Sequence, residues 1–207
     1  YVGASDLADH ILDSLADEVA YTVLRTARSE IVKDVMDYSA AICDREGRMV
    51  VQAKTIALHL GAVPEAMGEV LRRYGNDLHP GDAIIINDPY QGGMHLPDIF
   101  MFLPIFHDDT LIGFSVVICH HTDVGGRVAG SNASDSTEIY QEGLRIPVLK
   151  LYEKGVLNET LTRMYQRSTQ SVQLRLMAAR GSAVDMTDVA GVLEYDHKPG
   201  RPAPQYI

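Results

Sequence analysis

Several features that would assign this chain of 207 residues to a broad class are missing from its sequence. It has no run of about 18 or more apolar residues, so it predicts no membrane-spanning helix. Only 18 lysines and arginines stand against 28 acidic residues, a formal net charge of −10. With no concentrated basic patch, that balance is atypical of a nucleic-acid-binding protein. We therefore expect neither a membrane nor a nucleic acid as partner.

Cysteine is equally scarce. The two cysteines, Cys43 and Cys119, are far apart and share no C-x-x-C spacing, which predicts no disulfide framework and a reducing, cytoplasmic setting. No basic segment followed by an apolar stretch opens the chain, so we expect no secretory leader in it. Because the first residue is Tyr1 rather than methionine, we expect the sequence to be a processed product or part of a longer polypeptide.

The composition, 46% hydrophobic and 22% charged, is sufficient for a substantial core in one large or two small domains. Residues 7–28 predict an amphipathic helix, because apolar side chains recur at four-residue steps from Leu7 to Val23. Residues 64–74 predict a second, shorter helix that begins at Pro64 and ends at Gly75.

Between and after these helices the pattern changes to strands. Residues 39–53 predict a β-hairpin around an Asp-Arg-Glu-Gly turn, and residues 82–88 contain a short buried strand. Two apolar runs joined by His-Asp-Asp-Thr predict a second antiparallel hairpin over residues 99–119. The expected fold class is α+β, with a mixed or antiparallel sheet packed against the two helices. A further helix is expected at 170–180, followed by an extended, proline-rich tail from Lys198.

The candidate site lies at the open end of the second hairpin, within a stretch rich in histidine. With the turn centred between Asp108 and Asp109, antiparallel pairing predicts that Asp98 faces Cys119 and that Pro97 faces His120. His95 and Asp98 enter the hairpin where His120 leaves it. The sequence therefore predicts that these three side chains converge.

Two imidazoles and a carboxylate form a ligand set suited to zinc or manganese, with a coordination position left open. The rings of His95 and His120 should then lie within about 8 Å of each other. Because neighbouring residues of a strand point to opposite faces, His121 is not expected to bind the same ion, and we predict that it serves as an acid–base group or as a hydrogen-bond partner. Asp123 is predicted to orient a ligand or to transfer protons. His59 either lines this site or only caps and packs the second helix.

The same residues resemble those of a known family, the B subunits of hydantoinases and 5-oxoprolinases, whose relatives include acetone and acetophenone carboxylases and caprolactamase. The resemblance rests on NDPYQGGMHLPDI (87–99), HHTDVGG (120–126) and YQEGLRIPVLKLY (140–152), and it covers about residues 10–164. It implies a hydantoinase B-like metal-binding domain over 1–164 and an unmatched C-terminal segment over 165–207. Two features depart from the family: Met94 stands where a threonine is common, and family B subunits are more than twice as long.

The resemblance also implies an activity and partners. An A-type subunit that uses ATP and Mg²⁺ would phosphorylate a carbonyl or amide oxygen, and this chain would hold a divalent metal through His95, Asp98 and His120. The small-molecule substrate would be a cyclic amide: a hydantoin, 5-oxoproline or a lactam. Two alternatives are a subunit of a ketone carboxylase and a non-catalytic scaffold. Other chains completing the B subunit are further possible partners.

Overall fold

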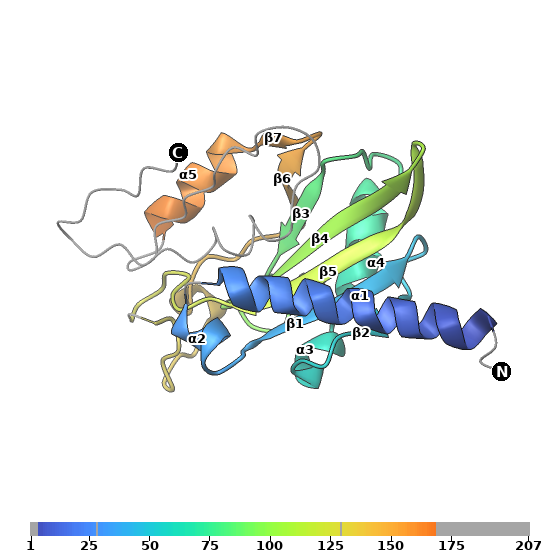
Figure 1. Cartoon of the computed structure of the whole chain (residues 1–207). Helices are drawn as coiled ribbons and strands as arrows, with labels where there is room; N and C mark the ends of the chain where they lie inside the picture. The colour runs from blue at the N-terminus through green and yellow to red at the C-terminus, as the bar shows by residue number, and fades with distance from the viewer. Residues whose placement is uncertain (1–3, 28, 129, 169–207) are drawn as a thin grey trace, which may run out of the picture.

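The computed structural model describes residues 4–27, 29–128 and 130–168, and its strands form one antiparallel sheet of the order β2-β1-β5-β4-β3-β6-β7 (Figure 1). The predicted helix at 170–180 and the predicted tail lie outside the described residues. The strands are β1 (Tyr38–Asp44), β2 (Met49–Gln52), β3 (Ala83–Ile86), β4 (Asp98–His107), β5 (Thr110–His120), β6 (Leu149–Glu153) and β7 (Val156–Leu157).

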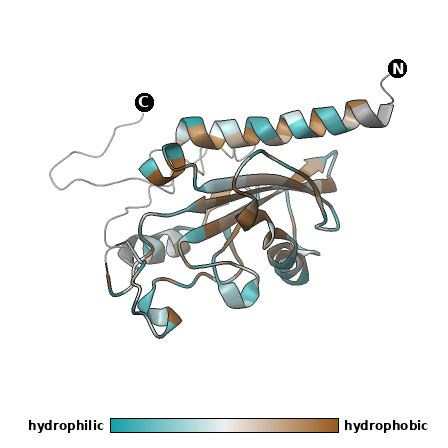
Figure 2. Ribbon diagram, turned by 90° about the horizontal axis from the view of Figure 1, so that it is seen from below, coloured by the Kyte–Doolittle hydropathy of each residue, from teal (hydrophilic) through white to brown (hydrophobic). Residues whose placement is uncertain are grey.

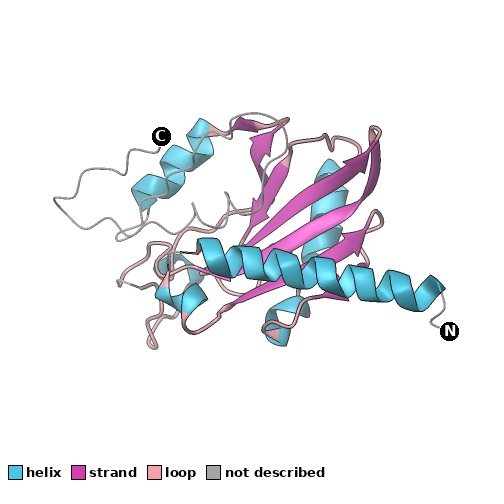
Figure 3. Ribbon diagram, viewed as in Figure 1, coloured by secondary structure: helices cyan, strands magenta, loops and turns pink. Residues whose placement is uncertain are grey.

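Helices cover both faces of this sheet, which confirms the predicted α+β class (Figure 3). They are α1 (Ala4–Thr26), α2 (Glu30–Lys33), α3 (Ala57–Leu60), α4 (Val63–Tyr74) and α5 (Glu159–Ser168), with 3₁₀ turns η1 (Pro89–Gln91) and η2 (Ile139–Gln141). In the part of the chain that the structure describes, no helix is both long and apolar enough to span a bilayer.

The alternation of side chains along the strands divides the core into two sides. On one side, Phe100, Phe102 and Phe114 pack with α3 and α4. On the other side, Ile99 and Met101 pack with α5, while Val117 and Cys119 pack with α1. Apolar residues consequently dominate the strands, and hydrophobic and hydrophilic residues alternate along α1 (Figure 2).

The N-terminal helix is present, but its predicted apolar stripe is only partly buried. Leu7, Ile11 and Leu15 are each at least half exposed, whereas Val23 and a line of alanines face the sheet. The reason is geometric. Residues four apart advance by slightly more than one turn of about 3.6 residues, so a line of such steps drifts around the helix axis.

The second hairpin is also confirmed, and its register near the turn is as predicted: Phe106 pairs with Leu111, and Asp108 and Asp109 form the turn with positive φ angles. The predicted pairing of Asp98 with Cys119 is wrong. Ile112 is an extra residue between two successive pairs, a β-bulge that shifts the rest of the hairpin by one position. Asp98 therefore pairs with His120.

Candidate metal centre

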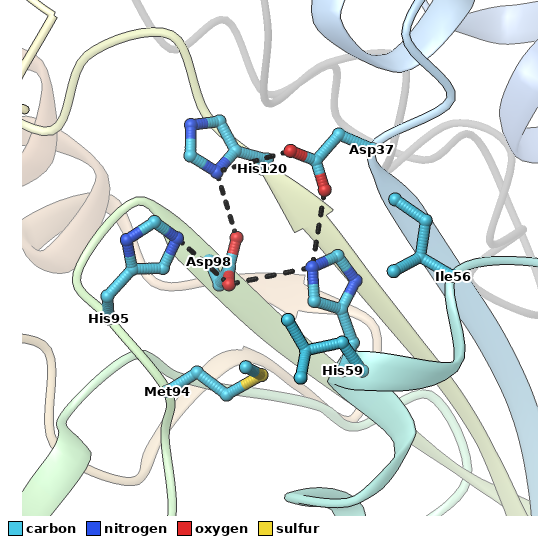
Figure 4. A pocket seen from close by; sticks show the side chains of 8 residues that line it. Asp37, Ile56, His59, Met94, His95, Asp98 and His120 are labelled. Atoms are coloured by element: carbon cyan, nitrogen blue, oxygen red, sulfur yellow. Dashed lines mark hydrogen bonds and ion pairs between the residues drawn. The ribbon is translucent and has the colours of Figure 1, made fainter.

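Two carboxylates and three imidazoles meet at the ends of β4 and β5, on the side of the sheet that α3 and α4 cover (Figure 4). Asp98 stands in the middle. Its Oδ1 lies 3.0 Å from Nδ1 of His120, and its Oδ2 lies 3.0 Å from Nε2 of His95 and 3.7 Å from Nε2 of His59. The ring centroids of His95 and His120 are 5.0 Å apart, which confirms the predicted convergence.

The β-bulge at Ile112 is the reason that this pair shares one face of the sheet. A shift of one residue in the pairing of a strand moves its side chains to the opposite face. Without the extra residue, Cys119 would lie opposite Asp98, and His120 would point to the side of α1 and α5. The site therefore depends on an irregularity 8 residues before His120 in the sequence.

His95 comes from the loop between β3 and β4, which is fixed by the side chain of Asn87. The Nδ2 of this fully buried residue donates hydrogen bonds to the carbonyls of Leu96 (2.7 Å) and Leu144 (2.9 Å), and its Oδ1 accepts one from the amide of Ile146 (2.6 Å). Gly92, at φ +91°, allows the loop to approach α4 closely, since a Cβ atom there would lie 2.5 Å from a backbone nitrogen. The residues around His95 thus serve mainly to fix the loop that holds its imidazole in place.

Asp37 is a member of the cluster that sequence reasoning missed. It precedes β1, which pairs with β5, and its carbonyl accepts a hydrogen bond from the amide of His120. Its Oδ2 lies 3.7 Å from Nδ1 of His120, and its Oδ1 lies 3.2 Å from Nε2 of His59. In the sequence, Asp37 stands directly before an apolar segment, which is a weak indication of its role. Nothing local in the sequence shows that this segment forms a strand next to β5.

His59, left open between two roles by the sequence, lines the site, and Ser39 fixes its tautomer. The hydroxyl of Ser39 donates its one hydrogen to the carbonyl of Ile56 (2.6 Å), so it accepts the bond from Nδ1 of His59 (3.0 Å). In the neutral ring, Nε2 then presents a lone pair to the carboxylates of Asp37 and Asp98. Such a lone pair beside two carboxylates is unfavourable unless the ring is protonated or a cation lies between them, so these residues fit a metal ion.

The distances and charges agree with that interpretation. Ligand atoms bound at about 2.1 Å to one ion lie roughly 3.0 to 3.5 Å from each other, similar to the separations around Asp98. Burial alone would raise the pKa of Asp98, but hydrogen bonds from His120 and His95 hold that pKa well below its ordinary value. The bond with Asp98 likewise raises the pKa of His95 against the opposing effect of burial. The cluster thus stabilises an anionic carboxylate beneath a half-exposed imidazole.

His121 and Asp123, predicted to transfer protons, are not brought into the cluster. His121 is fully buried beside Tyr165 of α5, whose hydroxyl lies 3.1 Å from its Nδ1, and burial lowers the pKa of His121 to about 3. Asp123 is also buried, and it accepts hydrogen bonds from the amides of Gly125 and Gly130 in its own loop. Their proton-transfer role remains a prediction.

The cluster forms the polar part of a pocket of about 550 Å³, a size suited to a small molecule. Its lining residues are Asp37, Ile56, Leu58, His59, Met94, His95, Asp98 and His120. Asp98, His59 and His120 are buried, while the side chain of His95 is 43% exposed. A ligand entering this space therefore meets an exposed imidazole first and the central carboxylate last.

This chain is similar to known proteins both in its sequence and in its structure. Residues 5–187 match the family profile described as hydantoinase B/oxoprolinase. The caprolactamase beta subunit of Pseudomonas jessenii is 37% identical over 168 residues, which cover 79% of this chain and 29% of that protein. The 5-oxoprolinase 1 of Arabidopsis thaliana is 35% identical over 151 residues, 73% of this chain and 12% of that protein. This chain thus spans less than a third of the length of either relative.

Solved structures share the fold. The crystal structure of the ATP-dependent caprolactamase from Pseudomonas jessenii superposes with a TM-score of 0.73 at 32% identity, covering 90% of this chain and 31% of that chain. Nucleotide-free acetone carboxylase superposes with a TM-score of 0.74 at 22% identity, covering 87% of this chain and 23% of that chain. At that lower identity the likeness concerns the fold alone.

Proposed function

This chain belongs to the hydantoinase B/oxoprolinase family, and from that membership we propose that it is the metal-binding subunit of a multi-subunit, ATP-dependent amidohydrolase that opens a cyclic amide. The observation that supports this most is the convergence of Asp37, His59, His95, Asp98 and His120 in one pocket. The proposed partner is an A-type subunit that uses ATP and Mg²⁺, as the family suggests. The proposed setting is the reducing cytoplasm, in keeping with the small number of cysteines, Cys43 and Cys119, both of which are buried.

The chemistry of the substrate gives a reason for ATP. An amide resists hydrolysis because its nitrogen lone pair is delocalised onto the carbonyl oxygen, and phosphorylation of that oxygen removes this resonance. In our proposal, the partner subunit carries out that step and this chain receives the activated ring. A zinc or manganese ion held by His95, Asp98 and His120 would supply Lewis-acid polarisation of a carbonyl or phosphoryl oxygen.

The residues of the chain divide the remaining tasks. Asp98, 1% exposed, anchors the imidazoles of His95 and His120, since it contacts both at 3.0 Å. Ser39 holds the ring of His59 with its Nε2 directed into the pocket. The half-exposed His95 is in a position to contact an incoming ring, and the buried base of the pocket keeps water away from the carboxylate.

The test is to measure metal content and ring opening together. We expect the purified chain to bind a divalent ion, and His95→Ala to lose it in elemental analysis. His107→Ala, which removes an exposed histidine at the far end of the same hairpin, is expected to keep it. With the A-type subunit and ATP, the wild-type chain should support hydrolysis of a cyclic amide.

Three results would contradict the proposal. Stoichiometric metal in His95→Ala would exclude the proposed centre. ATP turnover with acetophenone and bicarbonate, but not with hydantoin or a lactam, would instead assign the chain to a ketone carboxylase. Full activity of a metal-free complex would show that the chain serves only as a non-catalytic scaffold.

A further inference from the structure

Arg145, in the segment that follows η2, makes little use of its hydrogen-bond donors. Among the described residues its ion-pair partner is Asp88, whose Oδ2 lies 3.5 Å from Nε, and it donates no hydrogen bond to any of them. Its Cζ instead lies over the rings of Tyr90 and Tyr140, 5.7 and 5.4 Å from their centroids. Because a guanidinium also carries N–H groups on its two terminal nitrogens, Arg145 can donate paired hydrogen bonds to a ligand.

The two tyrosines that contact Arg145 are open to solvent. Tyr90 is 78% exposed on η1 and Tyr140 is 72% exposed on η2, while the side chain of Arg145 is 35% exposed. An aromatic ring orients a guanidinium by cation–π attraction, and each tyrosine hydroxyl is a further hydrogen-bond donor. Tyr90, Tyr140 and Arg145 therefore form an accessible group of donors around one positive charge, which we call the Arg145 site.

The Arg145 site is tied to the loop that carries His95. The Nδ2 of Asn87 donates hydrogen bonds to the carbonyls of Leu96 and Leu144. Leu96 follows His95 in the sequence, and Leu144 precedes Arg145. One buried amide thus holds both segments side by side, so the arginine is fixed relative to the loop that presents the exposed imidazole.

A ring activated by phosphorylation brings negative charge to a chain that is itself negative. The formal net charge of the chain is −10. Among the described residues that line the pocket there is no lysine or arginine, and its two carboxylates are those of Asp37 and Asp98. These carboxylates repel a phosphoryl group, whereas an arginine binds one through paired, parallel hydrogen bonds. The Arg145 site supplies the kind of group that the pocket lacks.

We infer that Arg145, Tyr90 and Tyr140 form a phosphate-binding site beside the loop of the proposed metal centre. Its ligand is a phosphate group, either attached to the activated ring as a monoester or free as inorganic phosphate. The role of this site in ring opening rests on the proposed function. The binding of phosphate does not, because it requires neither the metal nor the partner subunit.

The first experiment titrates inorganic phosphate and phenyl phosphate into the full chain, with a chelator present and binding followed by NMR. We expect Arg145→Gln to weaken the binding of both at least about tenfold, as for the loss of charge-assisted hydrogen bonds. Arg145→Lys keeps the charge but lacks the planar pair of donors, and should weaken binding at least about threefold. Tighter binding of phenyl phosphate than of inorganic phosphate assigns the site to the ring-bound group, and equal binding assigns it to the free anion.

Arg73→Gln is the matched control. The Cζ of Arg73, on α4, also lies over a tyrosine ring, 5.4 Å from the centroid of Tyr74, so its loss removes the same charge and a similar contact elsewhere. This variant should bind phosphate as the wild type does. The inference is overturned if the wild type binds no phosphate, if Arg145→Gln binds it equally well, or if acetate binds as tightly as phosphate. The last result would identify the site as a contact for a carboxylate of a partner protein.

A second experiment measures ring opening with the A-type subunit and ATP. At a zinc content equal to that of the wild type, which shows that the neighbouring loop is intact, Arg145→Gln should slow ring opening at least about tenfold. If this variant opens the ring at the wild-type rate, the inference is overturned and the amidohydrolase proposal stands. If phosphate binds through Arg145 but the wild-type complex opens no cyclic amide, the proposed function is overturned and the phosphate site stands.

Discussion

Replacing Asp98 by asparagine keeps the shape of the side chain and removes the charge at the middle of the cluster. Asp98 is 1% exposed and contacts both His95 and His120 at 3.0 Å. A buried aspartate with a strongly lowered pKa contributes on the order of 2–3 kcal/mol to the free energy of unfolding. We expect Asp98→Asn to lose about that amount, measured by urea denaturation in the presence of a chelator.

The loss in free energy of unfolding caused by Asp98→Asn depends on pH, because the pKa values of Asp98 and His95 are both shifted in the folded protein. The pKa of Asp98 is lowered, so its contribution is present above the unfolded value of about 3.9 and is lost as the pH falls below it. The pKa of His95 is raised, so its contribution is present below about 6.5 and is lost as the pH rises through its higher folded value. The difference between wild type and variant should therefore be largest between about pH 4 and 6.5.

The second part of this experiment measures how much zinc stabilises the wild type and the variant. At a zinc concentration about 100 times the dissociation constant, binding adds about 2.7 kcal/mol to the stability of the wild type and should add nothing to Asp98→Asn. Asp108→Asn, a matched change at an exposed residue in the hairpin turn, should stay within about 0.5 kcal/mol of wild type. A difference that is equal at pH 3, 5.5 and 8, or a variant that zinc still stabilises, would refute the reasoning.

Three further predictions concern packing and register. Ser39→Ala leaves Nδ1 of the buried His59 without its acceptor, and should lower the free energy of unfolding by about 1–3 kcal/mol in urea denaturation. Phe100→Ala empties a fully buried position between the sheet and α4, and should cost about 3–5 kcal/mol in the same assay; a loss below about 1 kcal/mol would contradict the packing described. Deleting Ile112 removes the β-bulge and shifts the pairing partner of Asp98 by one position, so zinc binding measured by calorimetry should fall at least about tenfold, whereas Ile112→Ala should preserve it.

Much of the fold was predictable because its signals are local. The helix at 64–74, the hairpin at 39–53 and the hairpin at 99–119 each combine a periodic apolar pattern with recognisable turn or cap residues. The second hairpin alone placed His95, Asp98 and His120 at the same end of the sheet, but Asp98 and His120 share one face only because of the β-bulge at Ile112. These features need no knowledge of how distant segments of the chain pack.

The features that were missed depend on non-local packing. Ile112 has the size and apolarity of an ordinary strand residue, so nothing in its type marks the β-bulge. Asp37 joins the cluster only because β1 adjoins β5, a pairing between residues 69 to 81 positions apart in the sequence. Leu7, Ile11 and Leu15 satisfy the pattern of a buried stripe, yet half or more of each side chain is exposed.

The five side chains of the cluster come from parts of the fold that differ in their stability against local opening. Asp98 and His120 belong to β4 and β5, interior strands of the sheet, each hydrogen-bonded to a neighbour on both sides. His59 belongs to the four-residue helix α3, and Asp37 to a short connection before β1. Regions of few buried contacts open at a small fraction of the free energy needed for global unfolding. We therefore expect α3 to open briefly while the sheet stays closed, so that amide hydrogens of α3 exchange with deuterium well before those of β4 and β5.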